Sequence, residues 1–508
     1  MKFAVPKYDA KSGSLVSIHF DSEVAGSRSL VDLFERFDLY APYVKTLDIY
    51  GRNSRFYSLD PDNFSTLLIM LEQRGSSSLL PNLRSFDLTS DQWRHNRGHW
   101  DCRYWVELLG SDKIKTVVLR SKAPPNWDFV IGYEQASSIV YALASHCPNI
   151  QKLSLYPRHA YNVGPFSMDL GLFISPWYKG IQNLNKLKSL SVSDGWLSDN
   201  TILGLGNLPE LTTLEFVYGD FHTGTEQPGS SSGVELNELL SPTAFPKLGT
   251  LTLDIELVDQ IYALQLQKMV KHVNDLELSV SLFINSLESG DPEFIDRDFE
   301  ESKELFQHEF LPLFANMPNL KDLKLTMCSP HSHIDKTLPV EFPGFVDAIS
   351  LPQLDFIGLV GVHFGSRALE RNLGSIWPQL TSLALPDQDA SLQELASFAT
   401  IPNLSHLLVR LKFATKYPLK PISRTKYAPL KILESSEGAE ISSESEVIDH
   451  TVRGLLYLWP NIRSIELITN DGAIVPFPDV NDKLNTLLSL PNPVETADNY
   501  VNYEHFEA

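Results

Sequence analysis

A nine-residue phrase recurs along the chain and constrains its fold more than any other feature. It reads MPNLKDLKL from Met317, LPNLRSFDL from Leu80, IPNLSHLLV from Ile401 and WPNIRSIEL from Trp459. In each copy one apolar residue, which we call position zero, is followed by apolar residues three and five places later. This period-two ending predicts a short β-strand with one buried face. The proline fits at the entrance of the strand because it has no N–H to donate to a ladder. We therefore expect a chain built from repeated strand-containing units.

The copies continue through the chain in one register. Position zero falls, in order, at Val44, Leu83, Ile114, Ile150, Leu187, Leu211, Leu248, Val273, Leu320, Leu354, Leu380, Leu404 and Ile462, with Leu15 as an expected first copy. Leu430 begins a degraded copy, because Ser435 stands where the third apolar residue belongs. Helical patterns, with apolar residues three and four apart, lie between the copies. They cover residues 27–37, 63–75, 133–146, 257–273 and 443–459. Copies begin about 24 to about 47 residues apart, a spacing typical of stacked units that complete each other's core.

Strand and helix alternate from copy to copy, which predicts an α/β fold. The phrase resembles the leucine-rich repeat, L-x-x-L-x-L-x-x-N/C-x-L, over residues 15 to 470. This resemblance implies a horseshoe-shaped solenoid with parallel strands on the concave face and irregular helices on the convex face. Only Cys328 and Asn470 occupy the Asn/Cys position among these copies, so we expect an irregular solenoid. The rival fold is a doubly wound nucleotide-binding sheet, but no G-x-G-x-x-G or G-x-x-x-x-G-K-[ST] motif follows any predicted strand.

We predict a single irregular solenoid over residues 1–491, with an N-terminal cap and a final capping helix in VNDKLNTLLSL (480–490). Residues 492–508 have no repeat and are predicted to form a C-terminal tail. Residues 288–304 carry a dense acidic run, which predicts a mobile, solvated insertion because like charges repel. A second loop, rich in serine and glutamate, is predicted at 434–446.

The charge balance argues against one class of partner. Lys and Arg total 42 against 63 Asp and Glu, and the formal net charge of −21 repels phosphate backbones, so we predict no nucleic-acid partner. The odd, sparse set of 3 cysteines fits a reducing compartment. No stretch approaches the roughly 18 apolar residues of a membrane span, and the N-terminus has no uninterrupted apolar signal segment. We therefore expect a cytoplasmic or nuclear protein, or one found in both places, without a membrane partner.

Motifs for metal binding and catalysis are weak. Cys328, His331 and His333 cluster in CSPHSH, but no fourth ligand or second ligand pair lies at zinc spacing, and the repeat consensus accounts for Cys328. The chain has no G-x-S-x-G elbow and no H-E-x-x-H helix. We predict no catalytic activity, no metal and no cofactor. Residues 93–105, WRHNRGHWDCRYW, mix Trp, Arg and His, which leaves open both a partner contact and packing between repeats.

Charged residues at set places of the repeat are the candidate partner-binding residues. Places two and four after position zero point away from the core, and place one lies on the rim. The candidates are Lys45, Arg84, Lys115, Lys188, Lys321 and Arg463 at place one, Lys152 at place two, and Asp48, Asp87, Glu215, Lys324 and Glu466 at place four. A basic rim beside an acidic column would orient a charged partner. The alternative is that lysines at exposed strand starts serve solubility alone.

The function follows from repeats without catalytic motifs, because a solenoid presents a large rigid surface to other proteins. The variable repeat length and the P-N-L phrase resemble fungal and plant F-box/leucine-rich-repeat proteins. That resemblance implies a substrate-recognition protein of a cullin-type ubiquitin ligase. It covers the repeats alone: no L-P-x-E-I-L-like phrase precedes Leu15, so the cullin adaptor stays open as a partner. The alternatives are a regulator similar to leucine-rich GTPase-activating proteins or ribonuclease inhibitors, and a scaffold without a ubiquitin role.

Overall fold

The structure is a computed structural model of the full chain. It describes residues 38–48, 67–69, 71–72, 75–76, 78–87, 101–119, 133–156, 180–217, 233–281, 292–328, 340–341, 344–414, 426–469 and 473–489. The chain divides into two compact units, Met1–Thr250 (unit 1) and Leu251–Ala508 (unit 2), which we describe separately. The expected copy at Leu15 and the tail over 492–508 lie outside the described residues. The single solenoid over 1–491 stays a prediction.

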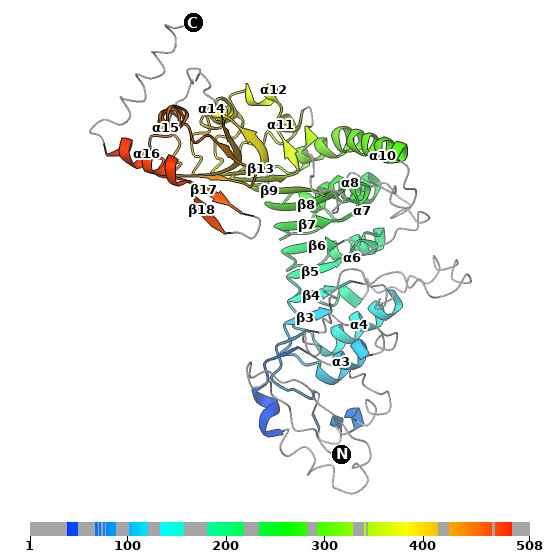
Figure 1. Ribbon diagram of the computed structural model, residues 1–508. Coiled ribbons are helices and arrows are strands. Elements are labelled where there is room, and N and C mark those ends of the chain that lie inside the picture. Colours follow the sequence, from blue (N-terminus) through cyan, green and yellow to red (C-terminus); the bar gives the residue numbers. More distant parts are fainter. Residues whose placement is uncertain are drawn as a thin grey trace. The chain divides into compact units, whose positions relative to one another are not determined.

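Unit 1 contains short strands that pair side by side in chain order. They are β1 (Thr46–Asp48), β2 (Ser85–Asp87), β3 (Thr116–Leu119), β4 (Lys152–Leu155), β5 (Ser189–Ser193) and β6 (Thr213–Val217), and β7 (Thr250–Asp254) begins at the unit boundary. Neighbouring strands from β1 to β6 are parallel. The helices are η2 (Ala41–Tyr43), α3 (Asp101–Leu109), α4 (Tyr133–His146), η5 (Asp194–Trp196), α6 (Asp199–Gly206) and α7 (Gly233–Leu239). Figure 1 shows α3 and α4 on the same side of β3 and β4.

Unit 2 continues the pattern with longer strands. Its main strands are β8 (Asp275–Ser281), β9 (Asp322–Cys328), β11 (Phe356–Val360), β13 (Ser382–Ala390), β14 (His406–Phe413), β15 (Ile432–Ser435) and β17 (Ser464–Ile468). They pair in this order and in parallel, and β18 (Ile474–Pro476) pairs antiparallel with β17. Three short strands lie outside this order: β10 (Val340–Glu341), which pairs with β12 (Val362–His363), and β16 (Glu440–Ile441), which pairs with β14.

Helices connect these strands. They are α8 (Leu257–Gln265), α9 (Gln267–Val270), α10 (Pro292–Leu305), α11 (Phe345–Ala348), α12 (Ser366–Leu369), α13 (Leu373–Ile376), α14 (Leu392–Phe398), α15 (Ser445–Leu458) and α16 (Pro478–Leu488). The last of these contains most of the predicted capping helix. Among the described helices, none combines the length and apolar character that crossing a bilayer requires.

The fold predicted from the repeat is confirmed. Every predicted copy from Val44 to Ile462 contains a strand, and each strand begins two residues after its position zero. In each unit the described strands form an open, mostly parallel sheet with helices between them. The protein is therefore an α/β leucine-rich-repeat solenoid. Its connections vary from a single turn of helix to the 14-residue α4, α10 and α15, which agrees with the irregular repeat spacing.

The core is a stack of the apolar residues that define the repeat. On β9, Leu320, Leu323 and Leu325 are each 0% exposed. In the sheet register Leu323 faces Leu276 of β8 on one side and Ile357 of β11 on the other. Burying such a side chain contributes about 1.5–3 kcal/mol relative to leaving it in water. Each repeat obtains this burial from its two neighbours, so it has no complete core of its own.

In several repeats the asparagine of the P-N-L phrase bonds the repeat to the one before it. Its side-chain amide, one place before position zero, donates to a carbonyl two places before position zero in the preceding repeat. The bonds run from Asn82 to Pro42, Asn149 to Asp112, Asn319 to Lys271 and Asn403 to Pro378, and Gln353 donates to Pro318 in the same way, all at 2.7 or 2.8 Å. These bonds satisfy turn carbonyls that a strand ladder leaves open. The phrase is thus repeated because its asparagine joins neighbouring turns as its leucines join neighbouring cores.

Ser435, which breaks the apolar pattern of the copy at Leu430, fits the structure without distorting it. Strand β15 pairs with β14 in the common register, and Ser435 is 0% exposed at the place of the third apolar residue. Its hydroxyl accepts the backbone N–H of Leu411 at 3.1 Å and donates to the Ser436 carbonyl at 3.2 Å. A buried N–H without a partner would cost about 1–3 kcal/mol, which explains a hydroxyl at this place.

The prediction of a mobile insertion over 288–304 is wrong from Pro292 onward, because these residues form α10. The helix continues directly into η7 (Phe306–Phe310) and η8 (Leu311–Asn316). The aromatic side chains of Phe306, Phe310 and Phe314 are each 0% exposed, and the first two stack at 4.9 Å between ring centroids. These residues recur every four places, so they anchor the helix at its C-terminal end, while Glu300, Glu301 and Glu304 are exposed.

We predict that Asn403→Ala lowers the free energy of unfolding by about 1 kcal/mol, because it removes the bond to the Pro378 carbonyl and leaves that acceptor in a partly buried turn. Urea denaturation followed by circular dichroism measures the change. The matched control is Asn461→Ala, since exposed Asn461 occupies the same place of the last repeat and makes no hydrogen bond to any described residue. Equal effects of the two substitutions would contradict a stabilising role for the amide bonds.

Candidate functional site

The side chains of each strand alternate between the core and solvent. On β9, Leu323 and Leu325 are buried, whereas Asp322 is partly exposed and Lys324 is exposed. We call the solvent side, formed by places two and four of the repeat, the strand face. Eleven of the twelve candidate residues have described side chains, all exposed or partly exposed on this face or its rim: Lys45, Arg84, Asp87, Lys115, Lys152, Lys188, Glu215, Lys321, Lys324, Arg463 and Glu466. The side chain of Asp48 lies outside the described part.

The rim of unit 1 brings four of these cations into one line. The backbone N–H of Arg84 donates to the Lys45 carbonyl at 2.8 Å, and the N–H of Lys115 donates to the Arg84 carbonyl at 2.8 Å. The line continues through Gln151 to Lys188, with N–H to carbonyl distances of 2.7 and 2.8 Å. Neighbouring strands lie about 4.8 Å apart, so the cationic side chains begin one strand spacing apart, or two where Gln151 intervenes.

A fifth cation lies beside this line. The N–H of Lys152 also donates to the Lys115 carbonyl, at 2.9 Å. We call the set the basic row: Lys45, Arg84, Lys115, Lys152 and Lys188. All five side chains are exposed, and within the described part of the chain no ion pair joins any of them to a carboxylate. Like charges this close repel one another, and an anion placed across the row would relieve that repulsion.

Three lysines, of which only Lys188 belongs to the basic row, act on the carboxyl of Glu210. The pKa of Glu210 lies below its ordinary value, mainly because Lys247 Nζ donates a hydrogen bond to it at 2.7 Å. The charges of Lys188 and Lys186 lower it further, to a smaller extent. The edge of unit 1 therefore favours the anionic form of a carboxylate that comes close.

The acidic candidates of unit 1 differ from the basic row. Glu215 accepts a hydrogen bond from the Ser191 hydroxyl, which also contacts the Tyr156 hydroxyl, so a chain of polar side chains crosses β4, β5 and β6. Asp87 lies in register beside Val118. The acidic column predicted at place four is thus interrupted by neutral residues in this unit.

In unit 2, three carboxylates gather where β8, β9 and β11 begin. Asp275 and Asp322 are direct partners in the register, and Asp355 immediately precedes the partner of Asp322 on β11. Burial, followed by the charges of Asp275 and Asp355, raises the pKa of Asp322 above its ordinary value of 3.8, against smaller opposing effects of Lys324 and Lys321. Lys324 lies 3.8 Å from a Glu277 carboxylate oxygen, although both side chains are about half exposed. Ionisation of Asp322 is therefore less favourable in the folded protein than in the unfolded chain.

A serine, a histidine and a carboxylate form a chain on the strand face of unit 2. Ser382 Oγ lies 2.8 Å from His406 Nδ1, and His406 Nε2 lies 2.5 Å from Glu434 Oε2. This order is that of an activated nucleophile, but catalysis of acyl transfer also needs donors for an oxyanion beside the serine. The backbone at Ser382 and His406 is engaged in the parallel ladder. We therefore interpret the chain as a network that holds three surface side chains in place.

The centre of the same face is apolar, which the sequence reasoning missed. Strand β11 presents Phe356, Gly358 and Val360, and in the register Gly358 lies beside Ala384, which lies beside Leu408. We call these five residues the apolar patch. Val360 is 43% exposed, and the other four are partly exposed. The signal was available, because place four reads Gly, Ala and Leu in three successive copies, but only the charges at that place were considered.

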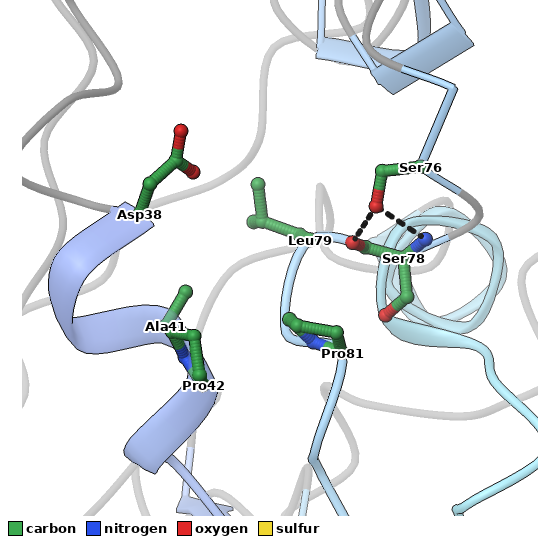
Figure 2. Close-up of a pocket in the computed structure, with 7 residues that line it drawn as sticks. All are labelled: Asp38, Ala41, Pro42, Ser76, Ser78, Leu79 and Pro81. Carbon is green, nitrogen blue, oxygen red and sulfur yellow. Dashed lines mark hydrogen bonds between the residues drawn. The ribbon is translucent and has the colours of Figure 1, made fainter.

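A pocket near the N-terminal end of the described residues is small. Figure 2 shows that it is lined by Asp38, Ala41, Pro42, Ser76, Ser78, Leu79 and Pro81. Ser76 Oγ donates to the Ser78 carbonyl at 2.8 Å at its edge. Its volume is about 60 Å³, whereas small-molecule sites usually measure about 300–1,000 Å³. It has room for a few water molecules rather than an organic substrate.

The described residues contain no group of three His, Cys, Asp or Glu that could hold a metal ion. His331 and His333 lie outside the described residues, so the CSPHSH cluster is not tested. Burial raises the pKa of the Cys147 thiol to about 11, which keeps it protonated and unreactive. The C-terminal part of the 93–105 stretch forms the start of α3, where Trp105 is buried and Arg103 pairs with Glu107 at 2.7 Å.

Comparison with known proteins gives a fold likeness without a family. No family model matches the sequence, and no curated protein matches it either. An internalin from Listeria monocytogenes is 12% identical, with 78% of this chain and 85% of that chain covered and a TM-score of 0.29. The leucine-rich-repeat-containing protein LegL7 from Legionella pneumophila is 13% identical, with 85% and 98% covered and a TM-score of 0.31. At these scores the assignment of the fold rests on the strand order and register described above.

We predict that Asp322→Asn raises the melting temperature at pH 7. The pKa of this acid is higher in the folded than in the unfolded state, so ionisation lowers stability as the pH rises from about 3.8 to the raised value. Below that window both states are neutral and the gain should vanish. Thermal unfolding of both proteins across this pH range measures it, with Asp112→Asn in unit 1 as the control. A lower melting temperature at pH 7 would show that Asp322 stabilises the fold.

Proposed function

We propose that the protein is a non-catalytic protein-interaction module, and that the basic row of unit 1 binds an acidic segment of a partner protein. The observation that carries this proposal is the row itself. Five exposed cations gather on one edge of a chain with a net charge of −21, and none of them pairs with a described carboxylate.

The geometry favours a segment that runs across the strands. Such a segment meets a strand about every 4.8 Å, and its own residues are at most about 3.3–3.6 Å apart when extended. Carboxylates at successive or alternate residues would therefore stay within reach of the long lysine and arginine side chains. One exposed pair contributes about 0.2–1 kcal/mol, so measurable affinity requires several at once. Binding should weaken as salt rises, because exposed charges are screened.

At a finer level, we propose that the partner is a substrate of a cullin-type ubiquitin ligase and that this chain recognises it. The support is the resemblance of the repeats, with their variable length and P-N-L phrase, to those of F-box/leucine-rich-repeat proteins. The proposal places the protein in the cytoplasm, the nucleus or both, where such ligases act. A regulator of an enzyme or a scaffold would use the same surface. Binding of the cullin adaptor distinguishes the ligase role from both.

We predict that the combined change Lys45→Glu, Arg84→Glu and Lys115→Glu weakens binding of acidic partners by about tenfold or more, because three attractions become repulsions. Affinity capture from native cell extract, quantified by mass spectrometry, compares this variant with the unaltered protein. The control is Arg103→Glu, which changes an exposed arginine on α3 rather than on the rim. Cooperative thermal unfolding of all three proteins shows that the fold is intact. Identical sets of captured proteins would exclude the basic row.

The ligase role, in contrast to a regulator or scaffold, requires that the chain bind the cullin adaptor. Co-expression of the two proteins followed by size-exclusion chromatography should give one complex, and the basic-row variant should retain it because the adaptor would bind elsewhere. Failure of the adaptor to co-elute, together with the absence of ligase subunits from the affinity capture, would remove the ligase role. The interaction module would then stand as a regulator or scaffold.

A further inference from the structure

Unit 2 carries an exposed surface whose chemistry differs from that of the basic row. Val360 of the apolar patch is 43% exposed, and Ile432 at its edge, in register beside His406, is 39% exposed. At places two and four of β1 to β6, the described residues of unit 1 are polar or charged, with Val118 as the exception. Apolar side chains on the strand face therefore concentrate in unit 2. An exposed apolar cluster rimmed by polar groups is typical of a binding surface.

The smallest side chains of this surface lie at its centre. Gly358 and Ala384 are neighbours in the register, between Lys324 on one side and Leu408 on the other. The Phe356 ring lies over Gly358, since a Cβ at Gly358 would come within 3.0 Å of that ring. An apolar side chain placed on Ala384 would contact the Phe356 ring on one side and Leu408 on the other.

Carboxylates border the apolar patch on two sides. Asp275, Asp322 and Asp355 lie where β8, β9 and β11 begin. On the other side, Glu434 is the direct register partner of Glu466. Like charges directly opposite each other on a sheet repel. On the first side the pKa of Asp322 is raised, first by burial and then by the charges of Asp275 and Asp355. The apolar patch thus has carboxylates on two borders, and this negative charge points to a cationic occupant.

We propose that the apolar patch is a second docking surface, which binds a partner segment with one or two apolar side chains flanked by lysine or arginine. The apolar side chains pack on the Phe356 ring and Ala384, and the flanking cations reach the carboxylates on both sides. This inference rests on the proposed function as an interaction module, but it uses the other unit and the opposite charge. The carboxylates would repel an acidic segment or an anionic lipid surface.

The test begins with random short peptides displayed on phage and selected on the full-length protein. The winning peptides are then synthesised with a fluorescent label, and their dissociation constants are measured by fluorescence anisotropy. We expect the winners to carry leucine, isoleucine or phenylalanine between lysines or arginines. Leu408→Ser should weaken them about tenfold, since it removes an apolar contact from a partly exposed position where the fold tolerates a change.

A matched pair of variants tests the charge requirement. Thr326 of β9 lies in register beside Val360, at the edge of the apolar patch. Thr326→Lys should weaken the selected peptides about threefold or more, whereas Thr326→Glu should leave binding unchanged or strengthen it. Asp322→Asn should weaken binding while it stabilises the free protein. A residue with a purely structural role could not give these opposite signs.

The outcomes separate this inference from the proposed function. The combined Lys45, Arg84 and Lys115 variant should bind the cationic peptides as well as the unaltered protein does. If the selected peptides are acidic and do not bind this variant, the result would support the basic row and overturn the second surface. Winners unaffected by Leu408→Ser, a selection without binders, or self-association through this face in analytical ultracentrifugation would also overturn it. Loss of the second surface alone would leave the proposed function in place.

Discussion

The structure depends on the burial of each repeat's leucines between the two neighbouring strands. A single repeat exposes both sides of its strand, so its apolar residues reach full burial only when adjacent copies keep the same register. Leu323 between Leu276 and Ile357 illustrates the arrangement. The asparagine amide at the turn adds a hydrogen bond to this apolar packing. That bond fixes the distance between successive turns. Register is therefore held at two points of every such repeat.

This division of labour leaves the strand face free to vary. Residues at places zero, three and five pack in the core, and the residue just before position zero often forms the bond between turns. A change at places one, two or four therefore has little effect on the stack. The basic row and the apolar patch are two results of that freedom. They lie in different units, and they differ in the sign of the charge that would bind them. A frame of this kind can present unrelated chemistries along one chain without altering its fold.

Much of the architecture could be predicted because it follows from local pattern. All the strands at the predicted copies begin two places after position zero, and the predicted helices at 133–146 and 443–459 appear as α4 and α15. The errors arose where one property of a segment was given too much weight. The acidic run before Phe306 was interpreted by its charge, although the aromatic residues that follow anchor it as a helix. Ser435 was interpreted as a fault in the pattern, although its hydroxyl satisfies a buried backbone N–H.

By itself the sequence determined the repeat, the strand positions and the side of each strand that faces solvent, because these depend on residue spacing within a few places along the chain. The tertiary structure decided which side chains of different repeats become neighbours. Connections of different length do not reveal that Gly358, Ala384 and Leu408 share one row, or that His406 reaches both Ser382 and Glu434. The parallel register sets these contacts, and it exists only once the repeats have stacked.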